Sequence, residues 1–165
     1  MDHAQKAREL FLSGCSCSQA VFAAFADDFG IDHDTALRLA SSFGGGMGGM
    51  RETCGAVSGM LMVAGLKWGY SEVGNLELKT AHYARVRSLI EAFKVEHSTI
   101  VCRELLAHLG ELKKDPSART AEYYKVRPCV LFVETAARLL DEMEAHDAKL
   151  HLNISGISSF CKGEP

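Results

Sequence analysis

Four cysteines in this chain share one local context, and their thiols could carry out redox or metal chemistry. Each lies at or beside the expected start of a helix, and the four are Cys17, Cys54, Cys102 and Cys129. At a helix start, unpaired backbone N–H groups and the positive end of the helix dipole stabilise a thiolate. Thiolates gathered in one pocket could hold a metal–sulfur centre or exchange electrons as dithiol and disulfide.

The apolar residues that follow each cysteine are expected on the same helix face as its sulfur. After Cys54, Val57 and Leu61 follow at offsets of three and seven, which fall on one side of a helix. The thiols should therefore point into the core, and the helix starts must converge if the thiols form one site. For one cysteine alone, a role as a small buried apolar residue is the simpler interpretation. The shared position of all four favours a common site.

Cys54 follows a stretch with five glycines in the six residues 44–49. Glycines so close together let the backbone take positive φ and pass near a neighbour without side chains in the way. We expect Gly45, Gly46 and Gly55 to approach a bound cofactor closely. Gly55, together with Gly59 and Gly65, could instead mark close helix crossings, because glycine inside a helix costs roughly 1 kcal/mol relative to alanine.

The same glycines formally satisfy the G-x-G-x-x-G pattern over residues 44–49. A dinucleotide site of that kind needs a strand before the glycines and a βαβ unit around them. Here the preceding segment has helical periodicity, so no nucleotide site is expected.

Composition and charge exclude several classes of function. A net charge of −3 gives no sign of an electrostatic nucleic-acid binder. The N-terminus lacks the basic and apolar segments of a signal peptide, and the least polar run, residues 56–68, is too short to span a bilayer. These features predict a cytoplasmic protein whose cysteines are reduced, metal-bound or catalytic rather than joined in structural disulfides.

The elements that must position the thiols are helices, because apolar residues recur at intervals of three and four almost throughout. The pattern predicts an all-α, single-domain bundle of about six helices with irregular connections. The expected helices cover residues 2–12, 19–29, 32–42, 52–68, 75–96 and 129–149, with a shorter one at 102–109 and a polar connection at 111–127. The helical cysteine-motif domain is expected to cover residues 1–150, and residues 151–165 to form a C-terminal tail.

At this point the residues resemble a family of putative redox-active proteins named for four cysteines around a CGAxxG motif, the C_GCAxxG_C_C type. Residues 54–59 match that motif, and the glycine run before them is typical of the family. The other cysteine segments of the family are similar to residues 17–21, 102–106, and 127–129 with 136–140. The resemblance covers residues 4–144. Ser16 stands where the family often has Asn, and Cys15 and Cys161 are additional.

The resemblance implies a small helical protein with a redox or cluster-binding role. A related segment occurs in some multi-centre cytochromes beside an iron–sulfur site. The first hypothesis is therefore an iron–sulfur cluster on the four cysteines that passes electrons to or from an unknown redox partner. Two thiols could instead cycle through a disulfide, with Cys54 as the nucleophile and Cys17 as the second catalytic residue.

Two other classes of function stay open. The first is a non-catalytic protein that holds zinc or another soft metal, although structural zinc usually takes C-x₂₋₄-C pairs that this chain lacks. The second is a helical interaction module with buried thiols. Arg51 and Arg103, each near a site cysteine, could stabilise thiolate charge or be ordinary surface residues. The apolar side of the helix at residues 75–96 permits a homodimer without requiring one.

Overall fold

The computed structural model describes residues 2–160, with side chains described as far as residue 149, and its N-terminal part consists of short capped helices. They are α1 (His3–Leu12), α2 (Cys17–Ala24), the 3₁₀ helix η1 (Ala26–Phe29) and α3 (His33–Ser41). Ser16 caps α2 through a reciprocal capping box with Gln19, which satisfies two amides that would otherwise lack partners. Gly30 ends η1 in the left-handed conformation, with φ of 64°, as expected of a glycine after a helix.

The rest of the chain contains two long helices and several short elements. They are α4 (Gly55–Trp68), α5 (Leu76–His97), α6 (Cys102–Leu105), the 3₁₀ helix η2 (Ala107–Leu109), α7 (Ala121–Val126) and α8 (Cys129–Phe160). The helix expected at residues 102–109 is thus broken at Leu106, where the backbone leaves the helical region. The polar connection at 111–127 contains one helix, α7, which Thr120 caps.

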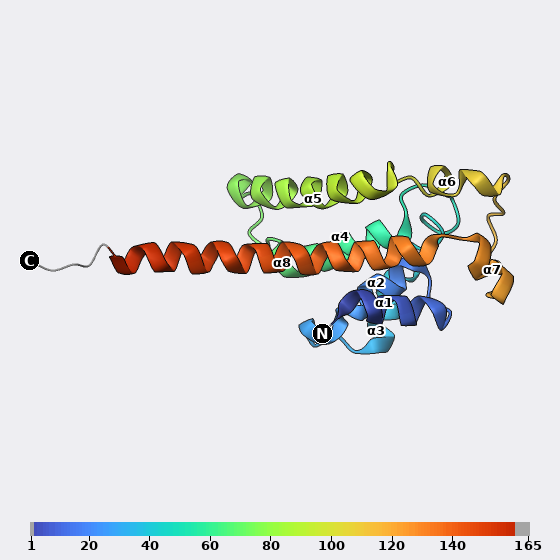
Figure 1. The fold of residues 1–165 in the computed structure, drawn as a ribbon, viewed down its shortest axis with the longest axis horizontal. Coiled ribbons are helices and arrows are strands. Elements are labelled where there is room, and N and C mark those ends of the chain that lie inside the picture. Colours follow the sequence, from blue (N-terminus) through green and yellow to red (C-terminus); the bar gives the residue numbers. More distant parts are fainter. Residues whose placement is uncertain (1, 161–165) are drawn as a thin grey trace, which may run out of the picture.

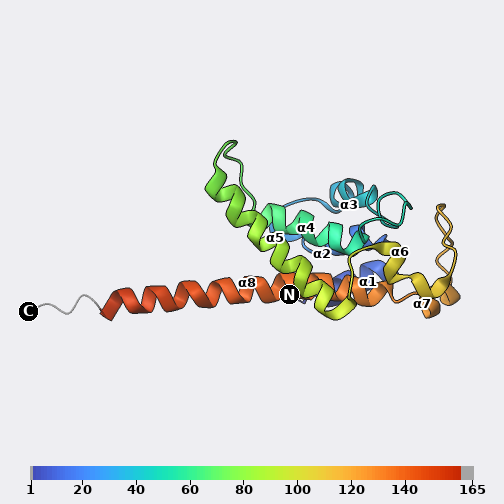
Figure 2. The ribbon, with the colours of Figure 1, turned by 90° about the horizontal axis from the view of Figure 1, so that it is seen from above.

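The long helix α8 packs against α1, α2, α4 and α5. In Figure 1, α5 runs on one side of α8, while α1, α2 and α3 lie on the other. α2 packs against α1, α3, α4 and α8, so it lies at the centre of the core. Figure 2 shows α6, α7 and the start of α8 together at one end of the molecule. Over the described residues the protein is all-α and forms a single domain, as predicted.

Close contact between α2 and α4 depends on two of the three glycines within α4. A Cβ built on Gly59 would lie 2.8 Å from the carbonyl oxygen of Ser18, and one built on Gly55 would lie 3.1 Å from the amide nitrogen of Ser18. Both glycines mark the predicted helix crossing. Gly65 does not, because no atom lies within 4 Å of its built Cβ. The prediction for Gly65 was therefore wrong.

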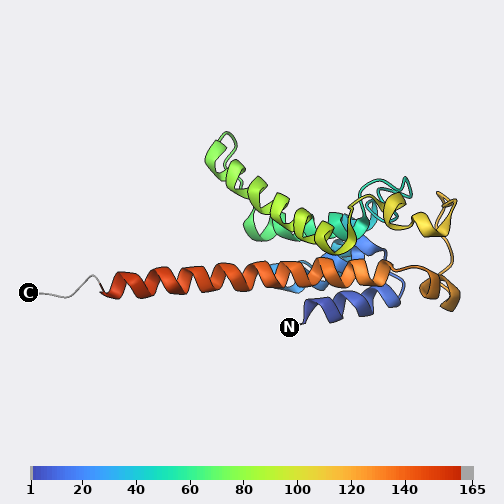
Figure 3. The same cartoon turned by 45° about the horizontal axis from the view of Figure 1, so that its top comes forward.

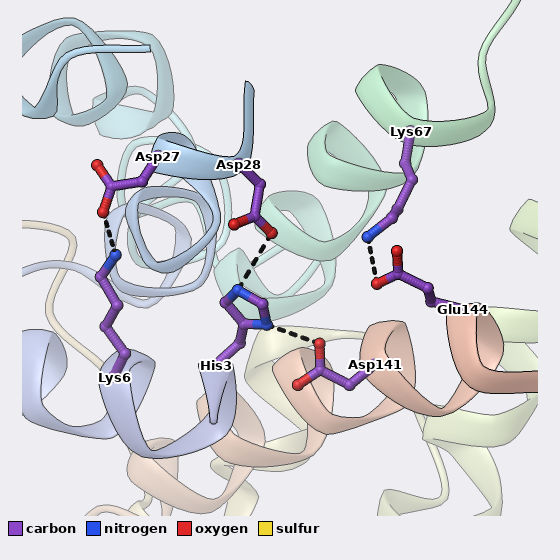
Figure 4. Close-up of polar contacts among 7 residues, drawn as sticks. All are labelled: His3, Lys6, Asp27, Asp28, Lys67, Asp141 and Glu144. Atoms are coloured by element: carbon purple, nitrogen blue, oxygen red, sulfur yellow. Dashed lines mark hydrogen bonds and ion pairs between the residues drawn. The ribbon is translucent and has the colours of Figure 1, made fainter. Parts of the chain in front are cut away.

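Ion pairs link the N-terminal helices and α4 to α8 (Figure 4). The buried His3 ring places Nδ1 2.7 Å from the Asp141 carboxylate on α8 and Nε2 3.2 Å from the Asp28 carboxylate on η1. Lys67 near the end of α4 pairs with Glu144 on α8. These contacts fix how far along α8 the N-terminal helices and α4 are positioned.

α8 continues to Phe160, beyond the end predicted near residue 149. Figure 3 shows its C-terminal part extending past the other helices. The division into a domain at 1–150 and a tail at 151–165 stays a prediction, and Cys161 lies outside the described residues. Within residues 2–160, none of the helices combines the length and the apolar character needed to cross a membrane.

Candidate functional site

The four predicted site cysteines lie at helix starts and line one cavity. Cys17, Cys102 and Cys129 are the first residues of α2, α6 and α8, and Cys54 directly precedes α4. The cavity that all four line has a volume of about 40 Å³, enough for about three water-sized groups. The fold therefore brings together thiols that are far apart in the sequence.

Backbone pairing places Cys54 beside Cys102. Thr53 and Val101 form an isolated antiparallel β-bridge. On either side of it, the Cys54 amide donates to the Ile100 carbonyl oxygen at 2.7 Å, and the Cys102 amide donates to the Glu52 carbonyl oxygen at 2.6 Å. These bonds fix the segment before α4 against the segment before α6.

The glycine loop makes room for this arrangement. Gly46 has φ of +70°, and a Cβ built on it would lie 2.7 Å from the Cβ of Cys102 and 2.9 Å from the amide nitrogen of Glu52. Gly55 lies similarly close to Cys17, with 3.2 Å between its built Cβ and the Cβ of Cys17. Gly45, Gly46 and Gly55 all line the thiol cavity. The atoms nearest their built Cβ positions belong to Arg51 and Gly49 for Gly45, to Cys102 and residues 51–52 for Gly46, and to Phe43, Ser18 and Cys17 for Gly55. Their approach to a cofactor stays a prediction.

The thiols of Cys17 and Cys129 line the same cavity, and each is the largest influence on the pKa of the other. The Cys17 thiol lowers the pKa of Cys129, and the positive charges of Arg127, Arg119 and Arg51 act in the same direction. The pKa of Cys17 is raised well above its ordinary value, first by Cys129 and then by burial. Of the two thiols, Cys129 is therefore the one that more readily becomes a thiolate.

The pKa values of the other two thiols, Cys54 and Cys102, are both raised, unlike that of Cys129. Burial raises the pKa of Cys54 to about 12, against the opposing effect of the Ala56 backbone N–H. Burial also raises the pKa of Cys102, although the Arg51 charge and hydrogen bond partly offset it. A thiol with so high a pKa is protonated at neutral pH, so this environment does not favour Cys54 as the nucleophile. Its predicted catalytic role stays a prediction.

Three arginines and a tyrosine complete the wall of the cavity. Arg119 stacks over the Tyr123 ring at 4.7 Å, and Arg127 lies 4.8 Å from the centre of the same ring. Arg119 also donates to the carbonyl oxygen of Cys15 at 3.2 Å. These contacts hold the guanidinium groups at the cavity. Stacking on aromatic rings suits arginine because its guanidinium is planar and weakly hydrated.

Sequence reasoning identified only part of this wall. Arg51 lines the cavity, a position from which it can stabilise thiolate charge. Arg103 instead forms an exposed ion pair with Glu52 at 2.7 Å. Arg119 and Tyr123 belong to the segment interpreted as a connection, and no pattern in the sequence singles them out. Arg127 had one signal, its position two residues before Cys129.

The donor set suits a metal–sulfur centre, while the present positions of the side chains do not form a site for one ion. Four cysteine thiols are the usual ligands of iron–sulfur clusters, and all four line this cavity. Between residues 2 and 149, however, no group of three or more His, Cys, Asp or Glu side chains is placed so that it could hold a metal ion. Ligation by these cysteines would therefore require side-chain rotation.

One comparison with known proteins gave a match. A family model described as putative redox-active protein (C_GCAxxG_C_C) matches residues 15–143. This range contains all four cysteines of the cavity and every arginine that lines it. Comparisons with curated proteins and with solved structures gave no match.

Proposed function

Because the chain belongs to the C_GCAxxG_C_C family of putative redox-active proteins, we propose that Cys17 and Cys129 form a two-electron dithiol/disulfide couple. The observation that carries this proposal is that the two thiols line one small cavity, where each is the main influence on the pKa of the other. A disulfide needs its two sulfurs within bonding reach, and both of these side chains face the same cavity of about 40 Å³.

The surroundings of the pair support a division of roles. Cys129 begins the 32-residue helix α8, so its sulfur lies near unpaired backbone amides and the positive end of the helix dipole. Arg119 and Arg127 add positive charge there, and both lower the pKa of Cys129. Cys129 is thus suited to act as the attacking thiolate and Cys17 as the resolving thiol.

The exchange step is balanced with a small disulfide, R–S–S–R, as the oxidant. The Cys129 thiolate attacks one sulfur, the S–S bond of the small disulfide breaks, and R–S⁻ leaves. Cys17 then attacks the mixed disulfide at Cys129, its proton passes to the first R–S⁻, and the second R–S⁻ leaves. The protein loses two electrons and gains the Cys17–Cys129 disulfide, and the small disulfide becomes two thiols.

We expect an equilibrium titration of the full chain in dithiothreitol redox buffer to give one two-electron transition, with a slope of about 30 mV per tenfold change in the ratio of the two forms. Peptide mapping of the oxidised form should find Cys17 joined to Cys129. Cys15 is the internal control, because it lies two residues before Cys17 and does not line the cavity. A disulfide that uses Cys15, or no intramolecular disulfide, would contradict the proposal.

A second candidate function, the binding of an iron–sulfur cluster, is favoured by one observation, namely that all four thiols line one cavity. Cys17, Cys54, Cys102 and Cys129 would hold the cluster, which would supply one-electron transfer. The arginines at the cavity would offset the negative charge of the four thiolates. The pairing of Cys54 with Cys102 through the Thr53–Val101 bridge would hold two ligands in fixed positions.

Anaerobic reconstitution with ferrous iron and sulfide tests this candidate. Binding of a cluster predicts iron and sulfide in equal amounts and a visible charge-transfer absorption, both lost in Cys54→Ser. The Cys17–Cys129 couple should survive the same substitution, because neither of its sulfurs is removed. Cys15→Ser is the matched control and should retain iron. Loss of the thiol couple but not of iron in Cys54→Ser would contradict both assignments.

A further inference from the structure

A second, larger cavity lies next to the thiol cavity. Its volume is about 290 Å³, so it has room for a small molecule rather than a few waters. The two cavities share Arg51, Arg119, Tyr123 and Arg127 in their walls. A molecule in the second cavity would therefore lie against the same arginines that face the Cys17–Cys129 pair.

The wall of the second cavity carries one sign of charge. Arg51, Lys114, Arg119 and Arg127 line it, and no Asp or Glu does. None of these four side chains takes part in an ion pair with a carboxylate in the part of the chain whose side chains are described. Four cations that converge without a carboxylate form a strongly positive site that attracts anions.

Two of these arginines also have buried nitrogens without a partner. Arg51 Nε and Arg119 Nη1 are buried and make no hydrogen bond in the structure. Buried polar groups are nearly always hydrogen-bonded, so each is available to an acceptor in the cavity. Arginine is well suited to bind carboxylate groups, because its N–H groups match both oxygens.

Glycines of the loop before α4 form part of the wall of the second cavity. Gly45, Gly48 and Gly49 line the cavity with φ of 62°, 59° and 83°. A Cβ built on Gly49 would lie 2.2 Å from the carbonyl oxygen of Lys114, so the loop backbone is in direct contact with the segment that carries this lysine. Because these glycines have no side chains, they leave room in the cavity, and Gly49 lies directly against the backbone of Lys114.

From this charge and position we propose that the second cavity binds a small disulfide that carries carboxylate groups and presents it to the Cys17–Cys129 pair. This inference rests on the proposed function for the pair of thiols that reacts. The carboxylates would lie among the cations of the wall, and the S–S bond would face the thiol cavity. The electron balance is that given above, in which the bound disulfide is reduced to two thiols while Cys17 and Cys129 become a disulfide.

The test compares two small disulfides that differ in charge and little in size. The first, 3,3′-dithiodipropionate, is a dianion at neutral pH, and the second, its diamide 3,3′-dithiodipropionamide, is neutral. In the reduced full chain at low salt, we expect the dianion to oxidise the Cys17–Cys129 pair on the order of tenfold faster or more, since a positive cleft raises association rates by that factor. Salt should reduce this ratio, because it screens the charges.

Lys114→Gln should bring the ratio toward one, and Lys113→Gln is the matched control. The two lysines are adjacent and exposed, and only Lys114 lines the cavity. The Lys113 contact to Arg51 uses the backbone carbonyl oxygen, which the control substitution retains. As a readout without redox chemistry, the thioether dianion 3,3′-thiodipropionate should slow the alkylation of Cys129 by iodoacetamide in the wild type and not in Lys114→Gln.

The outcomes separate the two proposals. Equal rates for both disulfides in the wild type, with no protection by the thioether, would overturn the anion site and leave the thiol couple standing. Protection by the thioether without formation of the Cys17–Cys129 disulfide would overturn the thiol couple and support the anion site. A ratio lowered as much by Lys113→Gln as by Lys114→Gln would show general surface charge and overturn the assignment to this cavity.

Discussion

Replacing Cys129 with serine should remove the fast reaction of the reduced protein with iodoacetamide at neutral pH. The Cys17 thiol and the nearby arginines lower the pKa of Cys129, and the thiolate is the reactive form. Because a lowered pKa extends the thiolate toward lower pH, alkylation of Cys129 in the wild type should be half-maximal at a lower pH than alkylation of an ordinary cysteine.

In the variant, Cys54 and Cys102 should react only as the pH rises, because burial raises the pKa of Cys54 to about 12 and also raises that of Cys102. The rate at pH 7 should fall on the order of tenfold or more, as expected when a thiolate is replaced by thiols with a pKa above about 8.5. The measurement is the rate of label incorporation from pH 5 to 10, with the labelled peptide identified by mass spectrometry.

Two controls make this result specific. Cys15→Ser should leave the fast reaction unchanged, because burial raises the pKa of Cys15 and its side chain does not line the cavity. Arg127→Gln should move the midpoint for Cys129 to higher pH, since it removes one of the charges that favour the thiolate. Fast labelling that persists in Cys129→Ser would assign the thiolate to another residue and contradict the proposed roles.

Gly46→Ala should destabilise the fold strongly, and Gly48→Ala should do so only mildly. Both residues have positive φ, +70° at Gly46 and +59° at Gly48, so both substitutions carry the left-handed backbone cost of about 1–2 kcal/mol. A Cβ on Gly46 would also lie 2.7 Å from the Cβ of Cys102 and 2.9 Å from the Cα of Arg51. At Gly48 the nearest atom, the carbonyl oxygen of Ser42, is 3.9 Å away.

The crowding at Gly46 adds the cost of overpacking, so the free energy of unfolding should fall by about 2–5 kcal/mol in Gly46→Ala and by about 1–2 kcal/mol in Gly48→Ala. Urea denaturation of both variants beside the wild type measures the difference. The disturbance should also move Cys102 and lower the yield of any cluster on reconstitution. Equal losses of stability in the two variants would mean that the close approach of the loop to Cys102 has no energetic importance.

Local signals in the sequence predicted most of the helices correctly. The helix expected at residues 19–29 ends before Gly30 as predicted, because capping depends on residues within one helical turn. It begins earlier than expected, at Cys17 after the cap Ser16, and it is divided at Phe25 into α2 and η1. The errors fall where tertiary contacts decide. Leu106 interrupts the helix expected at residues 102–109, and Gly65 has no helix beside it although Gly59 does. The helical periodicity of apolar residues does not show which glycine of a helix contacts a neighbouring helix.

The residues of the candidate site also fall into two groups, those that local sequence signals identified and those that only the fold revealed. The sequence identified the four cysteines and their positions at helix starts, because the glycine run and the capping residues act on adjacent backbone. It could not identify Arg119, Tyr123 or Lys114, which come from a connection without periodicity and reach the site only through the folded chain. It also could not show that Cys17 lies against Cys129 rather than against Cys54.

By itself, then, the amino-acid sequence determined an all-α protein with its thiols at helix N-termini, since helix formation and capping are set by neighbours along the chain. Only the tertiary structure decided which thiols influence each other, which of them has its pKa lowered, and which cations surround the pair. These properties depend on distances between segments far apart in sequence, and charge and hydrogen bonding act through those distances rather than through chain order.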